Sequence, residues 1–490
     1  MFFLLHATVA VRADTTALWD GSTAGWTDAI RWSTTPLFPN NSGANFFDAT
    51  VNAGAVTLDS AITVNRLTLG GGALDGPATL TALEGMQWSG GTIRGSGVLT
   101  LGDTAATTIA GGLQPLILTA RAVNLFGTTN FTSGTVRGGS GATILNATGA
   151  TFTTLGDASF FADFASPVWT FNNPGTFIAR STAGVGFTSM DARFNSSGTV
   201  RVEVAGTAAG HTLSLAGGGT HSGRFELDAG TAVELGGITT LQSGAAFSGP
   251  GRMVVAGSVF TSANFTADHL TVALGELSTG SSIVSAAISG TQTGGTTRID
   301  AGGILRVADG SGTWAFDDGM LTGAGALDAS LQAQGTIGPG SMLGTLRVTG
   351  SVELGSDARL SIEIGGAGTG AFDVLAVDGA TSLDGRLNIT LANGFRPDPA
   401  QAFAILTSSA ITGVFANAPL DGSHYPTADG LGLFRIHYTP GTVVLTAFIP
   451  EPSSSALGIG GAILCLARRP RRNRKIDIKI PVIKPRAMLP

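Results

Sequence analysis

Short runs of alternating apolar and polar residues, separated by glycine-containing breaks, constrain this chain more than any other feature. The runs "GTLRVTG", "ARLSIEIGG" and "GRLNITLANG" place an apolar residue at every second position. Such a period is typical of a β-strand that buries one face. The apolar positions are Leu346 and Val348, then Leu360, Ile362 and Ile364, then Leu387, Ile389 and Leu391. Helical spacing is nearly absent, so the sequence predicts an all-β fold.

A recurring step of Gly-x-Gly followed by alternating apolar residues predicts where the strands turn. The step occurs in "RGSGVLTLG" (94–102), "GGSGATILN" (138–146), "SGPGRMVVAG" (248–257), "LTGAGALDA" (321–329) and "TIGPGSMLGTLRV" (336–348). Glycine adopts positive φ without a steric penalty, which is what tight corners require. The interval between steps varies, so the repeat is degenerate.

Strands with glycine corners can form a sandwich, a barrel or a β-helix. A sandwich uses about 100 residues, so this chain would need several, and no Pro/Ser-rich linkers separate them. A solenoid instead grows by adding coils around one core. We therefore predict an elongated, right-handed parallel β-helix (β-solenoid) with roughly 20 to 25 residues per coil, followed by a single C-terminal hydrophobic helix.

The open ends of such a rod need caps. The segment "LWDGSTAGWTDAIRW" contains Trp19, Trp26 and Trp32, half of the six tryptophans in the chain. Tryptophan can close an apolar end while its indole N–H reaches a partner. The cluster is interpreted either as a packed N-terminal cap or as an exposed platform for carbohydrate.

Charge and cysteine content exclude several classes of partner and site. Between residues 14 and 449 there are 17 arginines and no lysine, against 31 acidic residues. So acidic a body argues against nucleic acid as a partner. The only cysteine, Cys465, lies near the C-terminus, so the body has neither disulfides nor cysteine-ligated metal.

The N-terminal residues 1–13, "MFFLLHATVAVRA", resemble a signal peptide cleaved before Asp14. The apolar stretch lacks a basic residue before it, contains His6, and has Arg12 near the cleavage position. A start codon placed too far downstream would explain these departures. The segment predicts export.

Two parts of the body resemble exported proteins built from autotransporter-associated β-strand repeats. The opening "TTALWDGSTAGWTDAIRWS", continuing into "NFFDATVNAGAVTLDSAITVNRLTLGGGAL", resembles the start of such proteins. The stretch from "GPGSMLGTLRVTGSVELGSDARLSIEIGG" to "FAILTSSAITGVF" resembles their C-terminal passenger region. The resemblance implies a repeat solenoid over residues 14–340 and a passenger-like β-rich segment over 341–449.

Residues 450–475 resemble a PEP-CTERM sorting segment. Pro450, Glu451 and Pro452 precede 15 uncharged residues, Ser453 to Ala467, and then the basic cluster Arg468, Arg469, Arg471 and Arg472. A run of 15 is short for a bilayer-spanning helix, which needs about 20, but can insert with local thinning. The arginines would be retained on the cytoplasmic side. The alternative is a buried strand followed by a solvated basic tail.

The resemblance implies an exosortase-type enzyme as the processing partner and a transient inner-membrane anchor. The mature protein would then reach the cell surface, the outer membrane or the extracellular matrix, with extracellular polysaccharide as a further partner. Family members usually stop soon after the arginines, whereas here residues 476–490, "IDIKIPVIKPRAMLP", follow. A frameshift or read-through would explain that tail.

Catalytic and metal-binding patterns are absent from the sequence. The six histidines form no close ligand spacing, although His211 and His221 are ten residues apart. No serine has glycines two positions away on both sides, so no nucleophile elbow is predicted. The segment "GGGALDGPATL" (70–80) is interpreted as a corner. Asp317 and Asp318 are adjacent and would face opposite sides of a strand, so we interpret them as a turn.

Three classes of function remain open, and none of them implies a cofactor. We favour a non-enzymatic exported structural protein, associated with biofilm or exopolysaccharide. A polysaccharide lyase or hydrolase on a β-helix would need clustered acidic and basic residues on one face. An autotransporter adhesin would need a C-terminal membrane barrel, for which the stretch after residue 340 is expected to be too short.

Overall fold

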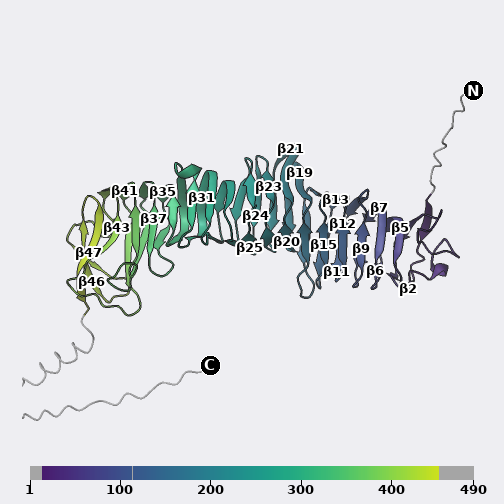
Figure 1. The fold of residues 1–490 in the computed structure, drawn as a ribbon, viewed down its shortest axis with the longest axis horizontal. Helices are drawn as coiled ribbons and strands as arrows, with labels where there is room; N and C mark the ends of the chain where they lie inside the picture. Colours follow the sequence, from purple (N-terminus) through teal and green to yellow (C-terminus); the bar gives the residue numbers. More distant parts are fainter. Residues whose placement is uncertain (1–13, 113, 452–490) are drawn as a thin grey trace, which may run out of the picture.

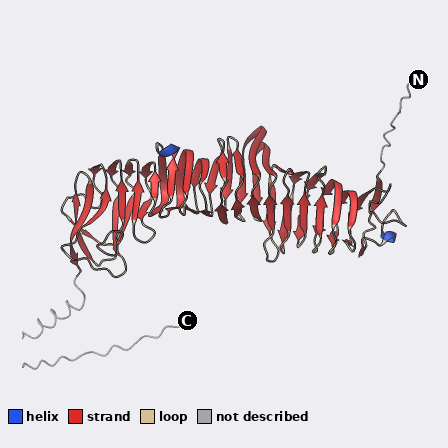
Figure 2. Ribbon diagram, viewed as in Figure 1, coloured by secondary structure: helices blue, strands red, loops and turns tan. Residues whose placement is uncertain are grey.

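The computed structural model describes residues 14–112 and 114–451, which form a long, gently bent stack of β-strands (Figure 1). Within that part of the chain there are 47 strands and two short 3₁₀ turns, η1 (Ala29–Arg31) and η2 (Ala308–Gly310). Figure 2 shows strands along the whole rod. The all-β solenoid predicted from alternation is confirmed, while the predicted C-terminal helix lies outside the described residues.

Each coil of the solenoid contributes strands to three parallel sheets, here named A, B and C in the order in which the chain visits them. Sheet A contains β1 (Thr15–Leu18), β3 (Phe47–Val51), β10 (Ala106–Ala110), β13 (Thr128–Ser133), β16 (Thr151–Leu155), β23 (Arg224–Leu227), β26 (Ala246–Ser248), β32 (Ile304–Val307), β34 (Ala326–Asp328), β37 (Thr345–Val348), β40 (Val374–Val377) and β43 (Phe403–Thr407). Sheet B contains β2 (Thr23–Gly25), β4 (Ala55–Thr57), β6 (Ala73–Asp75), β8 (Thr92–Ile93), β11 (Leu116–Thr119), β14 (Thr135–Gly139), β17 (Ala158–Ala162), β24 (Thr231–Leu235), β27 (Arg252–Val255), β35 (Ser330–Ala333), β38 (Val352–Leu354), β41 (Ala380–Leu383) and β44 (Ala410–Gly413). Sheet C contains β9 (Val98–Leu101), β12 (Ala122–Leu125), β15 (Thr143–Asn146), β18 (Thr170–Asn173), β20 (Arg193–Ser196), β22 (Gly219–His221), β25 (Ile238–Leu241), β28 (Ser258–Thr261), β30 (Glu276–Ser278), β36 (Thr336–Pro339), β39 (Arg359–Ile364) and β42 (Arg386–Leu391).

Seven longer strands bend around a corner and belong to more than one sheet. β5 (Ile62–Leu69) and β7 (Leu80–Trp88) run from sheet C into A. β19 (Thr176–Met190), β21 (Thr199–Leu215) and β29 (Phe265–Val272) run from A into B, β31 (Ile283–Ile299) passes through all three sheets, and β33 (Thr313–Gly323) runs from B into C. These strands join the three sheets into one continuous network.

The coil length matches the sequence-based expectation closely. In sheet A, from β3 to β37, register partners in neighbouring coils lie between 18 residues apart (Asp48 with Arg66) and 25 residues apart (Thr151 with Thr176). The pairing also crosses the predicted 340/341 boundary without interruption, because β34 pairs with β37 and β36 with β39. The two predicted segments therefore form one stack.

The inward-facing residues of all three sheets form a single apolar core. The alternating runs singled out in the sequence behave as predicted, since Leu346, Leu360 and Ile389 are fully buried. Phenylalanine rings dominate the middle of the rod, where Phe152 and Phe177 stack with centroids 5.6 Å apart and Phe225 and Phe247 with centroids 4.5 Å apart. Ladders of like side chains at the strand spacing of about 4.8 Å hold successive coils in register.

The glycine steps lie at the corners between strands. Gly95 has φ of 92° and Gly323 has φ of 120°. A Cβ atom at Gly95 would lie 2.5 Å from the carbonyl oxygen of Gly76, and one at Gly323 would lie 1.9 Å from that of Ile299. Both the backbone conformation and the coil beneath therefore exclude a larger residue.

A buried arginine holds one corner of three coils together. Arg121 precedes β12 and is fully buried. Its guanidinium donates hydrogen bonds to the carbonyl oxygens of Arg94 (2.8 Å), Gly76 (2.6 Å) and Ala78 (3.3 Å). Burial lowers the pKa of Arg121, yet three carbonyl acceptors satisfy the charged group.

The N-terminal end is closed by the tryptophan cluster. Trp26 is fully buried and Trp32 is 2% exposed, with ring centroids 4.7 Å apart. The indole N–H of Trp26 donates to the carbonyl oxygen of Pro39 (2.8 Å), and that of Trp32 to the carbonyl oxygen of Trp26 (2.8 Å). The rings form a packed cap, so the interpretation as an exposed carbohydrate platform is wrong.

The C-terminal end is closed in a different way, by antiparallel strands. β45 (His424–Pro426), β46 (Gly432–Tyr438) and β47 (Thr442–Pro450) form a meander, and β47 pairs antiparallel with β43, the last strand of sheet A. Phe434 and Phe448 pack together beneath it, with centroids 4.8 Å apart. The meander ends parallel stacking and leads directly to Pro450.

Candidate functional site

The predicted sorting motif begins at the outer end of the C-terminal cap. Pro450 is the last residue of β47 and pairs with Gly432, and both Pro450 and Glu451 are exposed. The backbone N–H of Glu451 donates to the carbonyl oxygen of Leu431 at 3.0 Å. An enzyme that takes the motif as an extended strand would first have to break this bond, at a cost of about 1 kcal/mol.

Several predicted site residues lie outside the described residues. These are the signal segment 1–13, Pro452, the apolar run from Ser453 to Ala467, Arg468, Arg469, Arg471 and Arg472, and the tail 476–490. Among the residues that the structure does describe, no helix has the length and apolar character needed to cross a membrane.

The two histidines considered as metal ligands both lie in the core. His211 is 1% exposed, and its Nε2 lies 3.0 Å from the hydroxyl of Thr188. His221 is fully buried against Phe225, with ring centroids 5.3 Å apart, and neither of its ring nitrogens makes a hydrogen bond. Burial lowers the pKa of each histidine to about 4. Across residues 14–112 and 114–451, no three His, Cys, Asp or Glu side chains gather as metal ligands would.

A polar ladder that was not predicted from the sequence runs past His221 on the inner side of sheet C. The amide nitrogen of Asn146 donates to Asn173 Oδ1 (2.7 Å), and that of Asn173 lies 3.0 Å from the hydroxyl of Ser196. Ser196 is the register partner of His221. Each asparagine also donates to a backbone carbonyl of the next coil. The signal in the sequence was an Asn or Ser one position after the alternating run, as in "TILN" and "TFNN".

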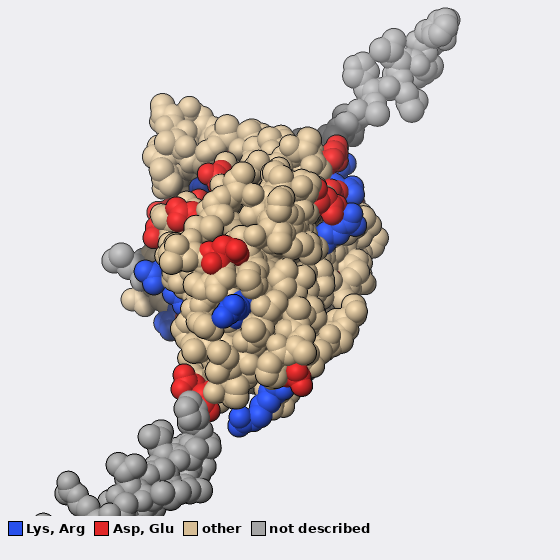
Figure 3. All heavy atoms as spheres, turned by 90° about the vertical axis from the view of Figure 1, so that its left-hand side faces the viewer, with Lys and Arg blue, Asp and Glu red and all other residues tan. Residues whose placement is uncertain are grey.

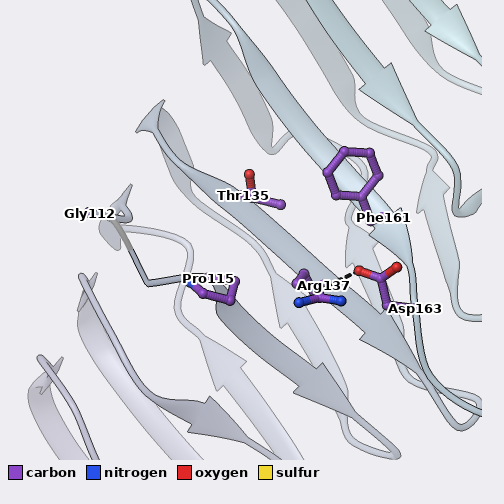
Figure 4. Close-up of a pocket in the computed structure, with 6 residues that line it drawn as sticks. All are labelled: Gly112, Pro115, Thr135, Arg137, Phe161 and Asp163. Atoms are coloured by element: carbon purple, nitrogen blue, oxygen red, sulfur yellow. Dashed lines mark hydrogen bonds and ion pairs between the residues drawn. The ribbon is translucent and has the colours of Figure 1, made fainter.

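A surface hollow of about 410 Å³ lies over sheet B beside the Phe-rich coils (Figure 4). Thr135 and Arg137 come from β14, Phe161 from β17, and Asp163 follows β17. Arg137 Nε donates to an oxygen of Asp163, and the ring of Phe161 is 37% exposed. Asp163 is the one carboxylate among the lining residues, so the two-carboxylate arrangement of most glycosidases is not present in this hollow.

A second hollow, of about 420 Å³, lies on sheet A. It is lined by Arg66, Leu67, Thr68, Glu84, Gly85, Met86, Gln87, Ala106 and Thr108. Gly85 and Ala106 leave the space, because neither fills the outward position between the strands. Arg66 Nε forms an ion pair with Glu84 at 3.3 Å.

A third hollow, of about 250 Å³, contains both Asp317 and Glu353. Their strands, β33 and β38, are separated by β35, two strand steps of about 10 Å in all. Gln332 of β35 lies between them and donates to Glu353 at 3.4 Å. Asp317 and Asp318 themselves lie where β33 bends and its register shifts, beside Gly319 with φ of 95°, so the predicted turn is a bulged corner within a strand.

Charged side chains are sparse on the end of the rod that carries the C-terminal cap, where uncharged surface separates small groups of acidic and basic residues (Figure 3). Figure 3 shows no large single-sign patch on this face. A face of this kind does not offer the broad basic surface that nucleic acid requires.

Comparison with known proteins identifies no relative from which a function could be carried over. No protein-family model matches the chain, and no curated protein matches it. The class that the fold defines is a three-sheet β-solenoid with a cap at each end.

Proposed function

We propose that the chain is a non-enzymatic exported structural protein, sorted through its C-terminal segment and associated with extracellular polysaccharide. One observation carries the proposal: a capped, uninterrupted solenoid ends in a strand whose last residue, Pro450, opens the sorting-like motif. In a sorted protein, a folded body must finish before the processing point. The cap does so at Glu451.

The finer parts of the proposal follow from the sequence resemblance. We propose a right-handed coil, a hydrophobic helix over Ser453 to Ala467 as a temporary anchor, and an exosortase-type enzyme that acts at Pro450, Glu451 and Pro452. Arg468, Arg469, Arg471 and Arg472 would stay on the cytoplasmic side. The body would then be displayed at the cell surface or in the matrix.

The test is the substitution Glu451→Ala in the native host. We expect an unprocessed form that keeps the C-terminal segment and fractionates with membranes, whereas wild-type protein is shortened and reaches the surface or matrix. Asp384→Ala is the matched control, since Asp384 is an exposed carboxylate at a corner of the solenoid. Equal processing of wild type and Glu451→Ala, by mass spectrometry of each fraction, would contradict the sorting proposal.

A polysaccharide-active enzyme is the second candidate, favoured by the hollow that contains Asp317 and Glu353. The same purified protein can be incubated with polysaccharides and the release of reducing or unsaturated ends followed. We expect no release. Turnover that is lost in Glu353→Gln would assign the protein to the enzyme class instead.

A further inference from the structure

The outward sides of the three sheets differ in charge over the first two thirds of the rod. Along sheet C, on the strand segments from Ile62 to Thr261, Arg193 is the one outward-pointing charged side chain among the described residues. Over the same coils, sheet A displays Arg180, Arg201 and Glu226, and sheet B displays Asp75 and Arg137. Sheet C is therefore the uncharged side of the molecule.

Sheet C carries one continuous outward row of residues that are uncharged and, except for two apolar members, polar. The row members are register partners or next neighbours in successive coils: Thr63, Thr81, Thr100, Asn124, Leu145, Asn172, Asn195, Thr220, Thr240 and Phe260. The first nine are half-buried by their neighbours in the row. We call this set the neutral row.

The polar groups of the neutral row are available to a ligand. In the part of the chain that the structure describes, the hydroxyls of Thr81, Thr100 and Thr240 make no hydrogen bond to protein, so they face water. Asn195 donates to Asn172 at 3.0 Å, which fixes both amide planes. Hydroxyl and amide groups thus repeat at about 4.8 Å along a straight line of roughly 45 Å.

The row ends where charge begins. Ile238 and Phe260 are 73% and 37% exposed and lie on adjacent strands, so they form an apolar step beside Thr240. In the next coils, Glu276 and Arg298 of sheet C form an ion pair at 3.1 Å. The uncharged surface is therefore bounded along the rod, as a binding site of defined length would be.

We propose that the neutral row binds an extended, uncharged polysaccharide chain that lies along the rod axis. Such a chain repeats hydroxyl groups at a spacing close to that of stacked strands, and its sugar rings have apolar faces that fit Leu145, Ile238 and Phe260. A charged polymer would find no opposite charges here apart from Arg193. A protein partner would need buried aromatic or arginine anchors near the centre of the row, and the residues there, Asn124, Leu145 and Asn172, are not of that kind.

This inference rests on the proposed association with polysaccharide and names the surface and the ligand class. The sheet B hollow with Phe161 and the sheet A hollow with Thr68 are local, whereas the neutral row spans ten coils. A long row of weak, repeated contacts gains affinity through multivalency, which suits a polymer.

The experiment compares two triple variants of the full-length chain, purified in detergent. Thr81→Glu, Thr100→Glu and Thr240→Glu place three charges on the neutral row, two of them on neighbouring strands. The control, Thr50→Glu, Thr68→Glu and Thr108→Glu, places three charges on half-buried outward threonines of sheet A, again with two on neighbouring strands. Circular dichroism checks that both variants fold, and the single variant Thr240→Glu serves if the triple one does not.

Binding is measured by depletion onto amorphous cellulose, an uncharged glucan, and onto alginate beads, a polyanion. We expect wild-type protein to bind cellulose, the neutral-row variant to bind at least about tenfold more weakly, and the sheet A control to stay within about twofold. The single variant should lose about threefold. No binding of wild type to cellulose, stronger binding to alginate, or an equal loss in the sheet A control would overturn the inference.

Two further readouts distinguish polysaccharide binding from sorting and from self-association. The Glu451→Ala protein should bind cellulose as wild type does, so a failure of sorting and a failure of binding are distinguishable. Sedimentation velocity reports whether the neutral row joins two copies of the chain. If the neutral-row variant dissociates a wild-type dimer, the row is a self-association surface and the polysaccharide inference is wrong.

Discussion

The middle coils and the C-terminal coils share the same three-sheet architecture but fill it with different side chains. Between Phe131 and Phe265 the core contains nine buried phenylalanines: Phe131, Phe152, Phe160, Phe171, Phe177, Phe194, Phe225, Phe247 and Phe265. Between Leu327 and Ile389 the buried apolar side chains are Leu, Ile, Val and Ala. The comparison teaches that strand pairing sets the coil, while the contents of the core are free to vary.

The two regions also bury different titratable groups. The middle coils bury His211 and His221, which burial keeps neutral, since it lowers the pKa of each to about 4. The C-terminal coils bury Asp373, whose carboxylate oxygens accept hydrogen bonds from the backbone N–H groups of Gly344 (3.0 Å) and Glu363 (2.8 Å). Burial raises the pKa of Asp373 to about 7. The regions should therefore respond to pH in opposite directions.

The largest effect is expected from truncating the phenylalanine core. The ring of Phe177 packs against those of Phe152, Phe171 and Phe194, with centroids 5.6, 5.5 and 5.2 Å away. Phe177→Ala should therefore cost about 3–5 kcal/mol of local stability through the cavity it leaves.

Because a solenoid is stabilised mainly between neighbouring coils, the loss should be confined. Hydrogen exchange followed by mass spectrometry should show faster exchange in β16, β19 and β21 and little change in β37 to β42. Leu360→Ala is the matched control and should give the reverse pattern. Uniformly faster exchange along the rod would contradict the comparison, since it would mean that the rod unfolds as one unit.

The second prediction concerns acid. The pKa of His221 in the folded chain, about 4, is below its ordinary value of 6.5, so the unfolded state binds more protons between these pH values. Stability of the middle coils should therefore be complete above about pH 6.5 and fall as the pH drops toward 4, by at most about 1.4 kcal/mol per pH unit for each histidine. His221→Leu should flatten this dependence, as measured by hydrogen exchange corrected for the intrinsic rate at each pH.

The C-terminal coils should behave oppositely. The folded pKa of Asp373 lies above its ordinary value of 3.8, so the folded state binds more protons between 3.8 and about 7, and stability is lost as the pH rises through that window. We expect a shallower slope than for His221, because two backbone N–H donors hold the ionised carboxylate. Asp373→Asn should remove the slope. The same sign of pH dependence in both regions would contradict the comparison.

Much of this fold could be predicted from sequence because in–out alternation and glycine corners are local. Leu360, Ile362 and Ile364 are buried as predicted, and Leu391 is partly buried against the core. The number of sheets and the antiparallel cap of β45, β46 and β47 were not predicted, since alternation says which side a residue faces and not which strand it pairs with. The inner ladder through Asn146 and Asn173 was missed because a polar residue at a strand end looks like a turn.

The candidate site was less predictable than the fold. The sorting motif is linear, so Pro450 and Glu451 could be named from sequence, but the bond that ties Glu451 to Leu431 depends on the cap. The neutral row is not visible in the sequence, because its members lie 18 to 27 residues apart and belong together only through register. Arg121 was overlooked for the same reason, since its acceptors lie up to 45 residues earlier.

The smallest effect is expected from a surface ion pair of the C-terminal coils. Arg306 Nε lies 2.7 Å from Asp328, with both side chains about one third exposed (34% and 26%). Arg306→Gln should cost no more than about 1 kcal/mol, and the difference should disappear in about 1 M salt, where screening acts within about 3 Å. In the middle coils, Glu203 is 10% exposed and binds both Arg180 and Arg201, so Arg180→Gln should cost more, because it leaves a nearly buried carboxylate with one partner fewer. Denaturant unfolding of the two variants at low and high salt tests the order. If Arg306→Gln proved the more destabilising, the contrast between an exposed pair and a buried network would not hold for this rod.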